Sequence, residues 1–257
     1  MLCILWGRKT GYSYSFHNMN PAFLGIGAQK AGTTWLHRNL NDHPEIWMPE
    51  DKELHWWYDD DPEMDRFRVV RRTGTMEQYQ TLFKEGEGKV TGEITPEYSV
   101  LSVEKIRMLH KHLPDLKILL LLRDPVERAW SAAKMYAKKS YAGEPVPTQD
   151  MPPHHPIIQA YMQFFASEFC QRMGDYHQII ENWQSVYPLK QFFIRSHQDI
   201  INESAKVIRD VFQFLEVSVH YSPTHLRKRF NVSRPGEMPD VIRDFLMALY
   251  TKKAPEL

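Results

Sequence analysis

Residues 27 to 35 read GAQKAGTTW and could bind an anion. They follow the apolar run at 22–26 and precede a helix-like pattern. In a strand–loop–helix turn, backbone N–H groups and the helix N-terminus point to one spot, which favours negative charge. Lys30 adds a positive charge, and the hydroxyls of Thr33 and Thr34 add donors. The segment therefore predicts an anion site, and the alternative is an ordinary turn with a surface lysine.

The position of the lysine bears on which anion is bound. In a Walker A loop the lysine directly follows the last glycine. Here Lys30 precedes Gly32, in the order Lys30-Ala31-Gly32-Thr33-Thr34. This order weakens an assignment as an ATP hydrolase or kinase but leaves the anion site intact.

A second candidate site follows the apolar run at 117–122, which is typical of a strand buried on both faces of a parallel sheet. Arg123 comes directly after this run, at the sheet edge where open α/β sheets bind ligands. Its planar guanidinium can hold a phosphate, and Ser131 follows about two helical turns later. The alternative is a structural ion pair of Arg123 with Asp124 or Glu127.

Strands and helices alternate along the chain, which predicts an α/β fold with a mostly parallel central sheet flanked by helices. We expect residues 1–20 to form an irregular leader and residues 21–257 to form a single domain. The expected strands lie at 22–28, 89–93, 117–122 and 191–194. The expected helices lie at 34–42, 75–83, 102–112, 126–137, 202–215 and 239–252, with two more within 157–187 and a proline-rich loop at 143–156.

Composition narrows the functional classes. Lysine plus arginine equal aspartate plus glutamate at 32 each, so bulk charge predicts no nucleic-acid partner. Cys3 and Cys170 cannot form a disulfide framework, which favours a reducing compartment. The start of the chain does not resemble a signal peptide, and no apolar stretch is long enough to span a bilayer. We therefore expect a cytoplasmic protein without a membrane anchor, and the sequence does not indicate its oligomeric state.

The two candidate sites together resemble the nucleotide motifs of sulfotransferases that use 3′-phosphoadenosine 5′-phosphosulfate (PAPS). The first motif is the segment at 29–34, and the second is Leu122-Arg123-Asp124-Pro125 with Arg128 and Ser131. The resemblance spans residues 22–136. Within the family, the chain is similar to the heparan sulfate type and its bacterial relatives. It implies a P-loop-like sulfotransferase fold, PAPS as the cofactor and 3′-phosphoadenosine 5′-phosphate (PAP) as its product.

The resemblance also assigns residues to the nucleotide. It implies that Arg123 and Ser131 bind the 3′-phosphate. The segment at 225–233 resembles the loop that closes over the nucleotide, which would add Lys228 and Arg229, although a solvated basic face is the alternative. The residues implied for the 5′-phosphosulfate are Gln29, Lys30, Ala31, Gly32, Thr33, Thr34 and Trp35.

Residues 52–57, KELHWW, resemble the family segment that carries the proposed general base. Glu53 would be that base, with His55 as its orienting partner or as an alternative base. The other interpretation of Glu53 is a surface salt bridge with Lys52. Ile94 stands where the heparan sulfate enzymes have a lysine, so charge stabilisation would rest more on Lys30 and on Lys52.

The implied function is in-line transfer of a sulfuryl group from PAPS to a carbohydrate or small metabolite, on a hydroxyl in preference to an amine. No metal is required. We expect the loop at 143–156 and the aromatic residues Tyr161, Phe164 and Phe165 to shape the acceptor pocket. Two alternatives stay open, namely a nucleotide kinase with an atypical phosphate loop and a non-catalytic nucleotide-binding protein of the same fold.

Overall fold

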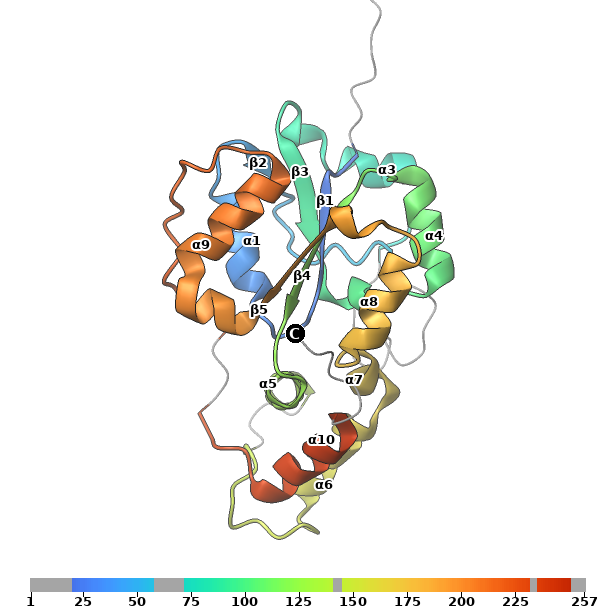
Figure 1. Cartoon of the computed structure of the whole chain (residues 1–257). Helices are drawn as coiled ribbons and strands as arrows, with labels where there is room; N and C mark the ends of the chain where they lie inside the picture. The colour runs from blue at the N-terminus through green and yellow to red at the C-terminus, as the bar shows by residue number, and fades with distance from the viewer. Residues whose placement is uncertain (1–19, 58–71, 141–144, 232–234, 251–257) are drawn as a thin grey trace, which may run out of the picture.

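A five-stranded parallel sheet forms the centre of the molecule (Figure 1). The computed structural model describes residues 20–57, 72–140, 145–231 and 235–250, so Cys3 and the expected leader up to residue 19 lie outside the described residues. The strand order is β2-β3-β1-β4-β5, and every pairing is parallel. The strands are β1 (Phe23–Gly27), β2 (Ile46–Trp47), β3 (Val90–Ile94), β4 (Lys117–Leu122) and β5 (Phe192–Ser196).

Helices cover both faces of this sheet, as Figure 1 shows. One face is covered by α1 (Thr33–Asn41) and α9 (His197–Leu215). The other is covered by α4 (Val103–His112) and α8 (Tyr176–Gln184), while α3 (Met76–Thr81) lies near the N-terminal end of β1. This arrangement confirms the expected α/β fold with a parallel central sheet.

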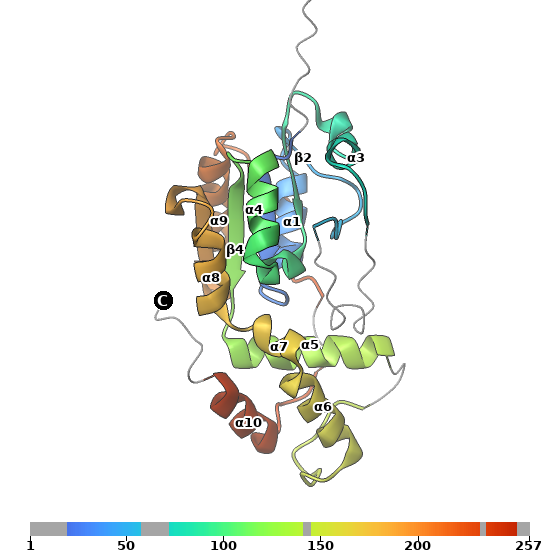
Figure 2. The ribbon, with the colours of Figure 1, turned by 90° about the vertical axis from the view of Figure 1, so that its right-hand side faces the viewer.

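A second group of helices lies beyond the C-terminal ends of the strands (Figure 2). It contains α5 (Pro125–Ser140), α6 (Pro156–Ala166), α7 (Glu168–Arg172) and α10 (Asp240–Tyr250). Their apolar faces form a separate buried cluster that includes Trp130, Phe165 and Ile242. No helix within the described ranges is long and apolar enough to cross a membrane.

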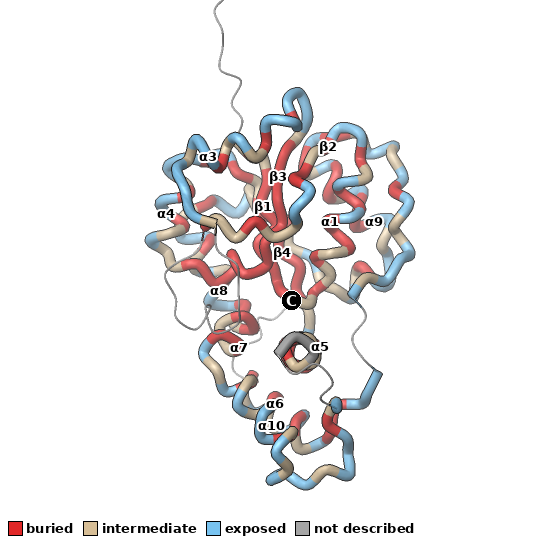
Figure 3. The backbone as a smooth tube through the Cα atoms, turned by 180° about the vertical axis from the view of Figure 1, so that it is seen from behind, coloured by how far each residue is buried: buried red, intermediate tan, exposed pale blue. Residues whose placement is uncertain are grey.

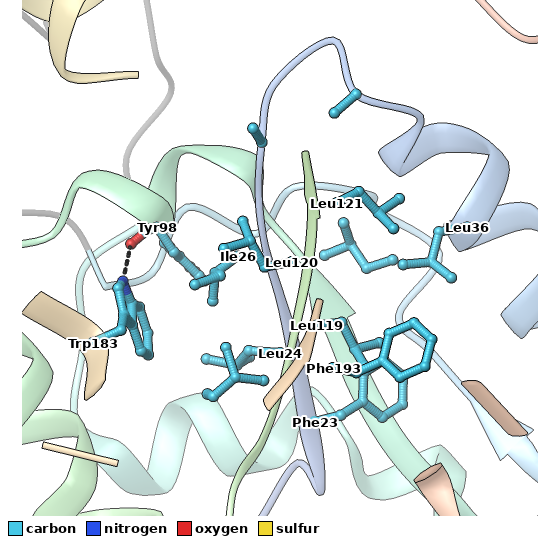
Figure 4. Close-up of a cluster of buried hydrophobic side chains, with 14 of the residues drawn as sticks. Phe23, Leu24, Ile26, Leu36, Tyr98, Leu119, Leu120, Leu121, Trp183 and Phe193 are labelled. Atoms are coloured by element: carbon cyan, nitrogen blue, oxygen red, sulfur yellow. Dashed lines mark hydrogen bonds between the residues drawn. The ribbon is translucent and has the colours of Figure 1, made fainter. Parts of the chain in front are cut away.

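The sheet is buried because its strands are apolar on both faces, as the red segments of Figure 3 show. Leu24 and Ile26 point toward Trp183, whereas Phe23 and Leu121 point to the opposite face (Figure 4). Trp183 Nε1 donates a hydrogen bond to the carbonyl of Tyr98 at 3.2 Å, which satisfies the one polar atom of this buried indole. The sheet therefore gives a rigid base to the loops that follow its strands.

Two of the expected helix assignments are wrong. The helix expected at 202–215 begins at His197, because Ser196 and Asp199 form a capping box that starts it five residues earlier. The segment at 157–187 holds three helices instead of two, since α6, α7 and α8 are separated by the N-caps Ser167 and Asp175. The two-residue strand β2 was not expected, because it is too short to give a periodic pattern.

Candidate functional site

A cleft of about 790 Å³ opens at the C-terminal edge of the sheet. Segments that follow β1, β3, β4 and β5 all contribute to its wall, as expected for a ligand site in an open α/β fold. Its lining residues are Gln29, Lys30, Gly32, Thr33, Thr34, Trp35, Glu53, His55, Pro96, Glu97, Arg123, Ser131, Met135, Tyr136, His197, Ile200, Ile201, Ser204, Leu226, Arg227, Lys228, Arg229, Phe230 and Asn231.

The loop between β1 and α1 forms one wall of this cleft. The N–H of Ala28 donates to the carbonyl of Leu121 at 2.7 Å, which ties the start of the loop to β4. Gly32 adopts φ 102°, and a Cβ atom there would lie 3.2 Å from Ile200 Cδ1. Glycine therefore fits both the left-handed backbone and the close approach of α9. The first turn of α1 lines the cleft, so a helix N-terminus is available to an anion.

Lys30 and Arg123 bring positive charge to the same wall. Arg123 Nη1 donates to the carbonyl of Lys30 at 3.2 Å, so the two candidate sites of the sequence are in direct contact. Arg123 Nη2 lies 3.5 Å from Glu127 Oε2, which is the structural pairing considered as an alternative. The arginine side chain still lines the cleft beside Ser131. Ion pairing and access to a ligand are therefore compatible at Arg123.

The segment at 225–231 lies against the first turn of α1. Trp35 Nε1 donates to the carbonyl of Leu226 at 3.0 Å, and Asn231 Nδ2 donates to Thr34 Oγ1 at 2.9 Å. Lys228 and Arg229 are exposed and line the cleft. The rest of the expected segment, from residue 232 to 233, lies outside the described residues.

Three titratable side chains meet at the end of the cleft formed by residues 53–55 and 96–97. His55 Nε2 lies 3.9 Å from Glu53 Oε2, and His55 Nδ1 lies 4.0 Å from Glu97 Oε2. Glu53 also forms an ion pair with Lys52, which is the alternative considered for it. One ligand atom from each of Glu53, His55 and Glu97 lies within 4.8 Å of the others, so this group has the donors and spacing to hold a metal ion.

Glu97 has the most perturbed carboxyl group of the cleft. Its side chain is 6% exposed, and its Oε1 accepts a hydrogen bond from Gln29 Nε2 at 2.9 Å. Burial, followed by the negative charge of Glu53, raises the pKa of Glu97 to about 7. Burial lowers the pKa of the His197 imidazole, and the positive charge of Arg123 lowers it to a smaller extent. The cleft therefore offers a carboxyl group that can gain or lose a proton near neutral pH.

Backbone strain is concentrated at this cleft. Among the described residues other than glycine, those with positive φ are Lys30, Glu53, His55, Asn231 and Glu216. The first four line the cleft, whereas Glu216 ends α9. Strained backbone at a shared surface is typical of sites whose geometry is held by the surrounding fold.

The structure brings together the residues expected from the sequence, with one exception. Ala31 is fully buried and does not line the cleft, whereas all the other expected site residues do. Ile94 is buried against Gly25 and is also absent from the lining. Sequence reasoning missed Glu97 and His197. Glu97 follows the strand expected at 89–93 by four residues, but nothing in the sequence indicates its burial.

The structure differs in part from the prediction of which residues shape the acceptor pocket. Tyr161 and Phe165 are buried in the cluster formed by the second group of helices, so they do not line the cleft. Phe164 packs on Tyr136, with ring centroids 5.3 Å apart, and Tyr136 does line the cleft. Residues 143 and 144 of the proline-rich loop lie outside the described residues, and those from 145 onward do not line the cleft.

Known proteins resemble the chain in both sequence and fold. Carbohydrate sulfotransferase 15 of Rattus norvegicus is 24% identical over 77% of this chain and 44% of the relative. Heparan sulfate glucosamine 3-O-sulfotransferase 6 of Mus musculus is 29% identical over 76% of this chain and 52% of the relative. The chain thus spans about half the length of these curated relatives.

A solved structure extends the likeness to the fold. A sulfotransferase from Alicyclobacillus acidocaldarius superposes with a TM-score of 0.69 at 24% identity, covering 91% of this chain and 92% of that one. The family model described as "Sulfotransferase domain" matches residues 21–242, which contain the sheet and every residue that lines the cleft. The chain therefore belongs to the sulfotransferase domain family.

Proposed function

We propose that this protein transfers a sulfuryl group from PAPS to a hydroxyl group of a carbohydrate or small-molecule acceptor. The observation that supports this most is the contact between Arg123 and the loop that carries Lys30, at a single cleft. PAPS is a nucleotide with anionic groups at both its 5′ and 3′ positions. A site with an anion-binding helix N-terminus and a separate arginine fits such a molecule better than it fits ATP.

The residues of the cleft divide into groups with separate roles. The loop at 29–34 and the N-terminus of α1 would bind the 5′-phosphosulfate. Arg123 and Ser131 would bind the 3′-phosphate, and Lys228 and Arg229 would add positive charge at the rim. A Cβ atom at Gly32 would crowd Ile200. Because glycine has no side chain, the backbone of the loop can approach the phosphate closely.

Transfer needs positioning and charge stabilisation more than covalent chemistry by the protein, by analogy with phosphoryl transfer. The acceptor oxygen forms a bond to sulfur as the bond from sulfur to the bridging phosphate oxygen breaks. PAP leaves with that electron pair, and Lys30 neutralises the developing charge. The acceptor proton goes to Glu53 or His55, which accelerates attack by roughly 10²–10⁴-fold.

The carbohydrate acceptor is proposed from the names of the relatives, which include a carbohydrate sulfotransferase and a heparan sulfate glucosamine 3-O-sulfotransferase. The acceptor end of the cleft carries Glu53, His55 and Glu97, which are groups able to hydrogen-bond hydroxyls and to accept a proton. The cytoplasmic location expected from the sequence stays a prediction.

Radiolabelled PAPS tests this proposal directly. The purified chain is incubated with [³⁵S]PAPS and a panel of oligosaccharides and small hydroxyl compounds, and labelled products are separated. We expect transfer to at least one acceptor class, and at least a 100-fold loss in Lys30→Ala because the charge on the leaving group is no longer neutralised.

Lys190→Ala, at an exposed lysine outside the cleft, is the matched control and should retain activity. Consumption of ATP with magnesium in place of PAPS would support the kinase alternative instead. Tight PAP binding without turnover of any acceptor would support a non-catalytic nucleotide-binding protein.

A further inference from the structure

The side-chain amide of Gln29, at the wall of the cleft, already uses both of its hydrogens within the protein. Its Nε2 donates to Glu97 Oε1 at 2.9 Å and to Tyr136 OH at 3.1 Å. A side-chain amide has two donor hydrogens and one acceptor oxygen. Gln29 therefore has no side-chain donor left for a bound molecule, and its Oε1 can only accept a hydrogen bond.

The surrounding structure fixes the direction in which this amide faces. If its nitrogen and oxygen were exchanged, the amide oxygen would face Oε1 of the Glu97 carboxyl group, and two acceptor oxygens would lie at hydrogen-bonding distance. Glu97 is held in the 3₁₀ helix Pro96–Val100, which follows β3 directly. The backbone beside Gln29 is held by a turn, in which the N–H of Ala31 donates to the carbonyl of Ala28 at 3.1 Å.

The oxygen of the Gln29 amide is buried without a partner. The residue is 6% exposed, and within the residues that the structure describes its Oε1 accepts no hydrogen bond. Gln29 nevertheless lines the cleft. Because a buried polar atom is rarely left unsatisfied, this oxygen indicates a ligand that brings an N–H or O–H donor to the wall of the cleft.

The phosphosulfate of PAPS does not have such a donor. Its sulfuryl group and its 5′-phosphate are ionised at neutral pH, so their oxygens can only accept hydrogen bonds. The side-chain oxygen of Gln29 would repel them. The backbone N–H groups of the loop and the ammonium group of Lys30 are suited to this anion, whereas the side chain of Gln29 is suited to a different group.

The neighbours of Gln29 point to the acceptor substrate as the source of the donor. Its partner Glu97 lies at the end of the cleft that also carries Glu53 and His55, where the proposed reaction places the attacking hydroxyl. Its neighbour in the chain, Lys30, serves the bond that breaks in this reaction. A donor that reaches Gln29 Oε1 would therefore lie beside the reacting atoms.

We propose that Gln29 is a specificity-determining residue, whose side-chain oxygen accepts a hydrogen bond from a second donor of the acceptor substrate beside the sulfated hydroxyl. This inference rests on the proposed function. The substrate class is a vicinal diol or amino alcohol, as in a sugar ring. A monohydric alcohol leaves the buried oxygen unpaired. A carboxylate or an existing sulfate at the second position is disfavoured, because its oxygens would face Gln29 Oε1 and the carboxyl groups of Glu53 and Glu97.

Monodeoxy substrates test the second donor on the wild type. The probes for the assay with radiolabelled PAPS are p-nitrophenyl β-glycosides of glucose, galactose and N-acetylglucosamine, with cyclohexanol as a monohydric alcohol. The labelled hydroxyl of the best glycoside is located by NMR, and analogues that lack each of its other hydroxyls are compared. We expect removal of one neighbouring hydroxyl to lower kcat/KM by at least about tenfold. Similar kcat/KM values for all analogues, or for cyclohexanol and the glycosides, would overturn the proposal.

Replacement of Gln29 shows whether this residue recognises the second donor. Methionine has a similar length but no amide, so in Gln29→Met the parent glycoside and the sensitive analogue should differ by less than about twofold. Gln184→Met, at an exposed glutamine on α8 outside the cleft, is the matched control and should retain the wild-type ratio. An unchanged ratio in Gln29→Met would contradict the assignment.

Calorimetric binding of PAP separates this role from one in nucleotide binding and needs no acceptor substrate. The PAP affinity of Gln29→Met should stay within about twofold of wild type, and a loss of about tenfold or more in a folded variant would assign Gln29 to the nucleotide instead. If no compound is labelled by the wild type, the proposed function itself fails. Transfer to glycosides without sensitivity to deoxygenation removes this inference alone.

Discussion

The protonation of a carboxyl group in the cleft depends on how deeply its side chain is buried. Glu97 and Glu53 both approach His55, yet Glu53 is open to solvent and paired with Lys52. Glu97 loses most of its hydration on folding, which penalises its charged form. Ionisation of this carboxyl group therefore lowers the stability of the fold.

Replacing Glu97 with glutamine should stabilise the protein in a pH-dependent way. The folded pKa of about 7 lies above the ordinary value of 4.5, so the stability that this group contributes is present below pH 4.5 and is lost as pH rises through 7. Glutamine does not ionise and retains the acceptor for Gln29. We expect Glu97→Gln to raise the free energy of unfolding at pH 8 by up to about 3 kcal/mol, with no gain below pH 4.5.

Urea denaturation at pH 4.5, 6 and 8 measures this difference. Glu104→Gln is the matched control, since its side chain is exposed and its substitution should leave the unfolding free energy almost unchanged at each pH. A constant difference between Glu97→Gln and wild type across these pH values would show that burial does not perturb this carboxyl group.

Among the structural elements, the loop between β1 and α1 depends most on one glycine. Gly32 combines φ 102° with contacts to α9 that leave little room for a side chain. Gly88, in the turn before β3, has φ 82°, and a Cβ atom added there would meet no other atom within 4 Å. The two glycines thus share a left-handed backbone but differ in their surroundings.

Alanine at these two positions separates backbone strain from the shape of the anion site. Each substitution should cost roughly 1–2 kcal/mol of stability, because a Cβ atom disfavours the left-handed conformation. Only Gly32→Ala should also weaken PAP binding, by at least about tenfold, since its Cβ atom also displaces Ile200 or the loop. Urea unfolding and calorimetry measure the two effects, and equal PAP affinity in both variants would contradict this account of the loop.

Elements with a strong local pattern were predictable from the sequence. The apolar run of β4 and the glycine-threonine loop before α1 were both placed correctly, because burial on two faces and a tight turn restrict residue type. The start of α9 was misplaced because its capping box lies in a polar segment without apolar periodicity. The division of α6, α7 and α8 depends on single capping residues that a hydrophobic pattern does not reveal.

Across the whole molecule, the sheet brings distant segments to one cleft. Arg123 was predictable because it directly follows a buried strand, and Lys30 because it lies in a recognisable loop. Glu97 and His197 were not, because their places in the cleft and the shifts of their pKa values depend on burial and on neighbours distant in the sequence. Trp35 and Asn231 likewise gain partners almost 200 residues away in the chain.

Acid sensitivity is a further property of the whole fold. His37 on α1 is buried, and neither of its ring nitrogens has a hydrogen-bond partner in the portion that the structure describes. Burial, followed by the charges of Lys52 and Arg38, lowers its pKa from 6.5 to about 4. Between these two pH values the unfolded chain binds a proton that the folded chain excludes. The free energy of unfolding therefore decreases as the pH is lowered through this window.

His37→Leu should remove this part of the acid sensitivity. Relative to wild type, we expect its unfolding free energy to rise by up to about 3 kcal/mol on going from pH 7 to pH 4. The comparison with wild type at each pH cancels the opposite effect of Glu97. His220→Leu, at an exposed histidine, is the control and should show no such gain. A His37→Leu curve parallel to wild type would show that His37 has the same pKa in the folded and unfolded states.

The most direct measurement of the central claim is calorimetric binding of PAP, ADP and ATP. We expect PAP to bind at least tenfold more tightly than ADP, because its 3′-phosphate contacts Arg123, and we expect Arg123→Ala to remove this preference. Arg195→Ala, on β5 and outside the cleft, should retain it. Equal or tighter binding of ATP with magnesium, or an unchanged preference in Arg123→Ala, would contradict the assignment of this cleft to PAPS.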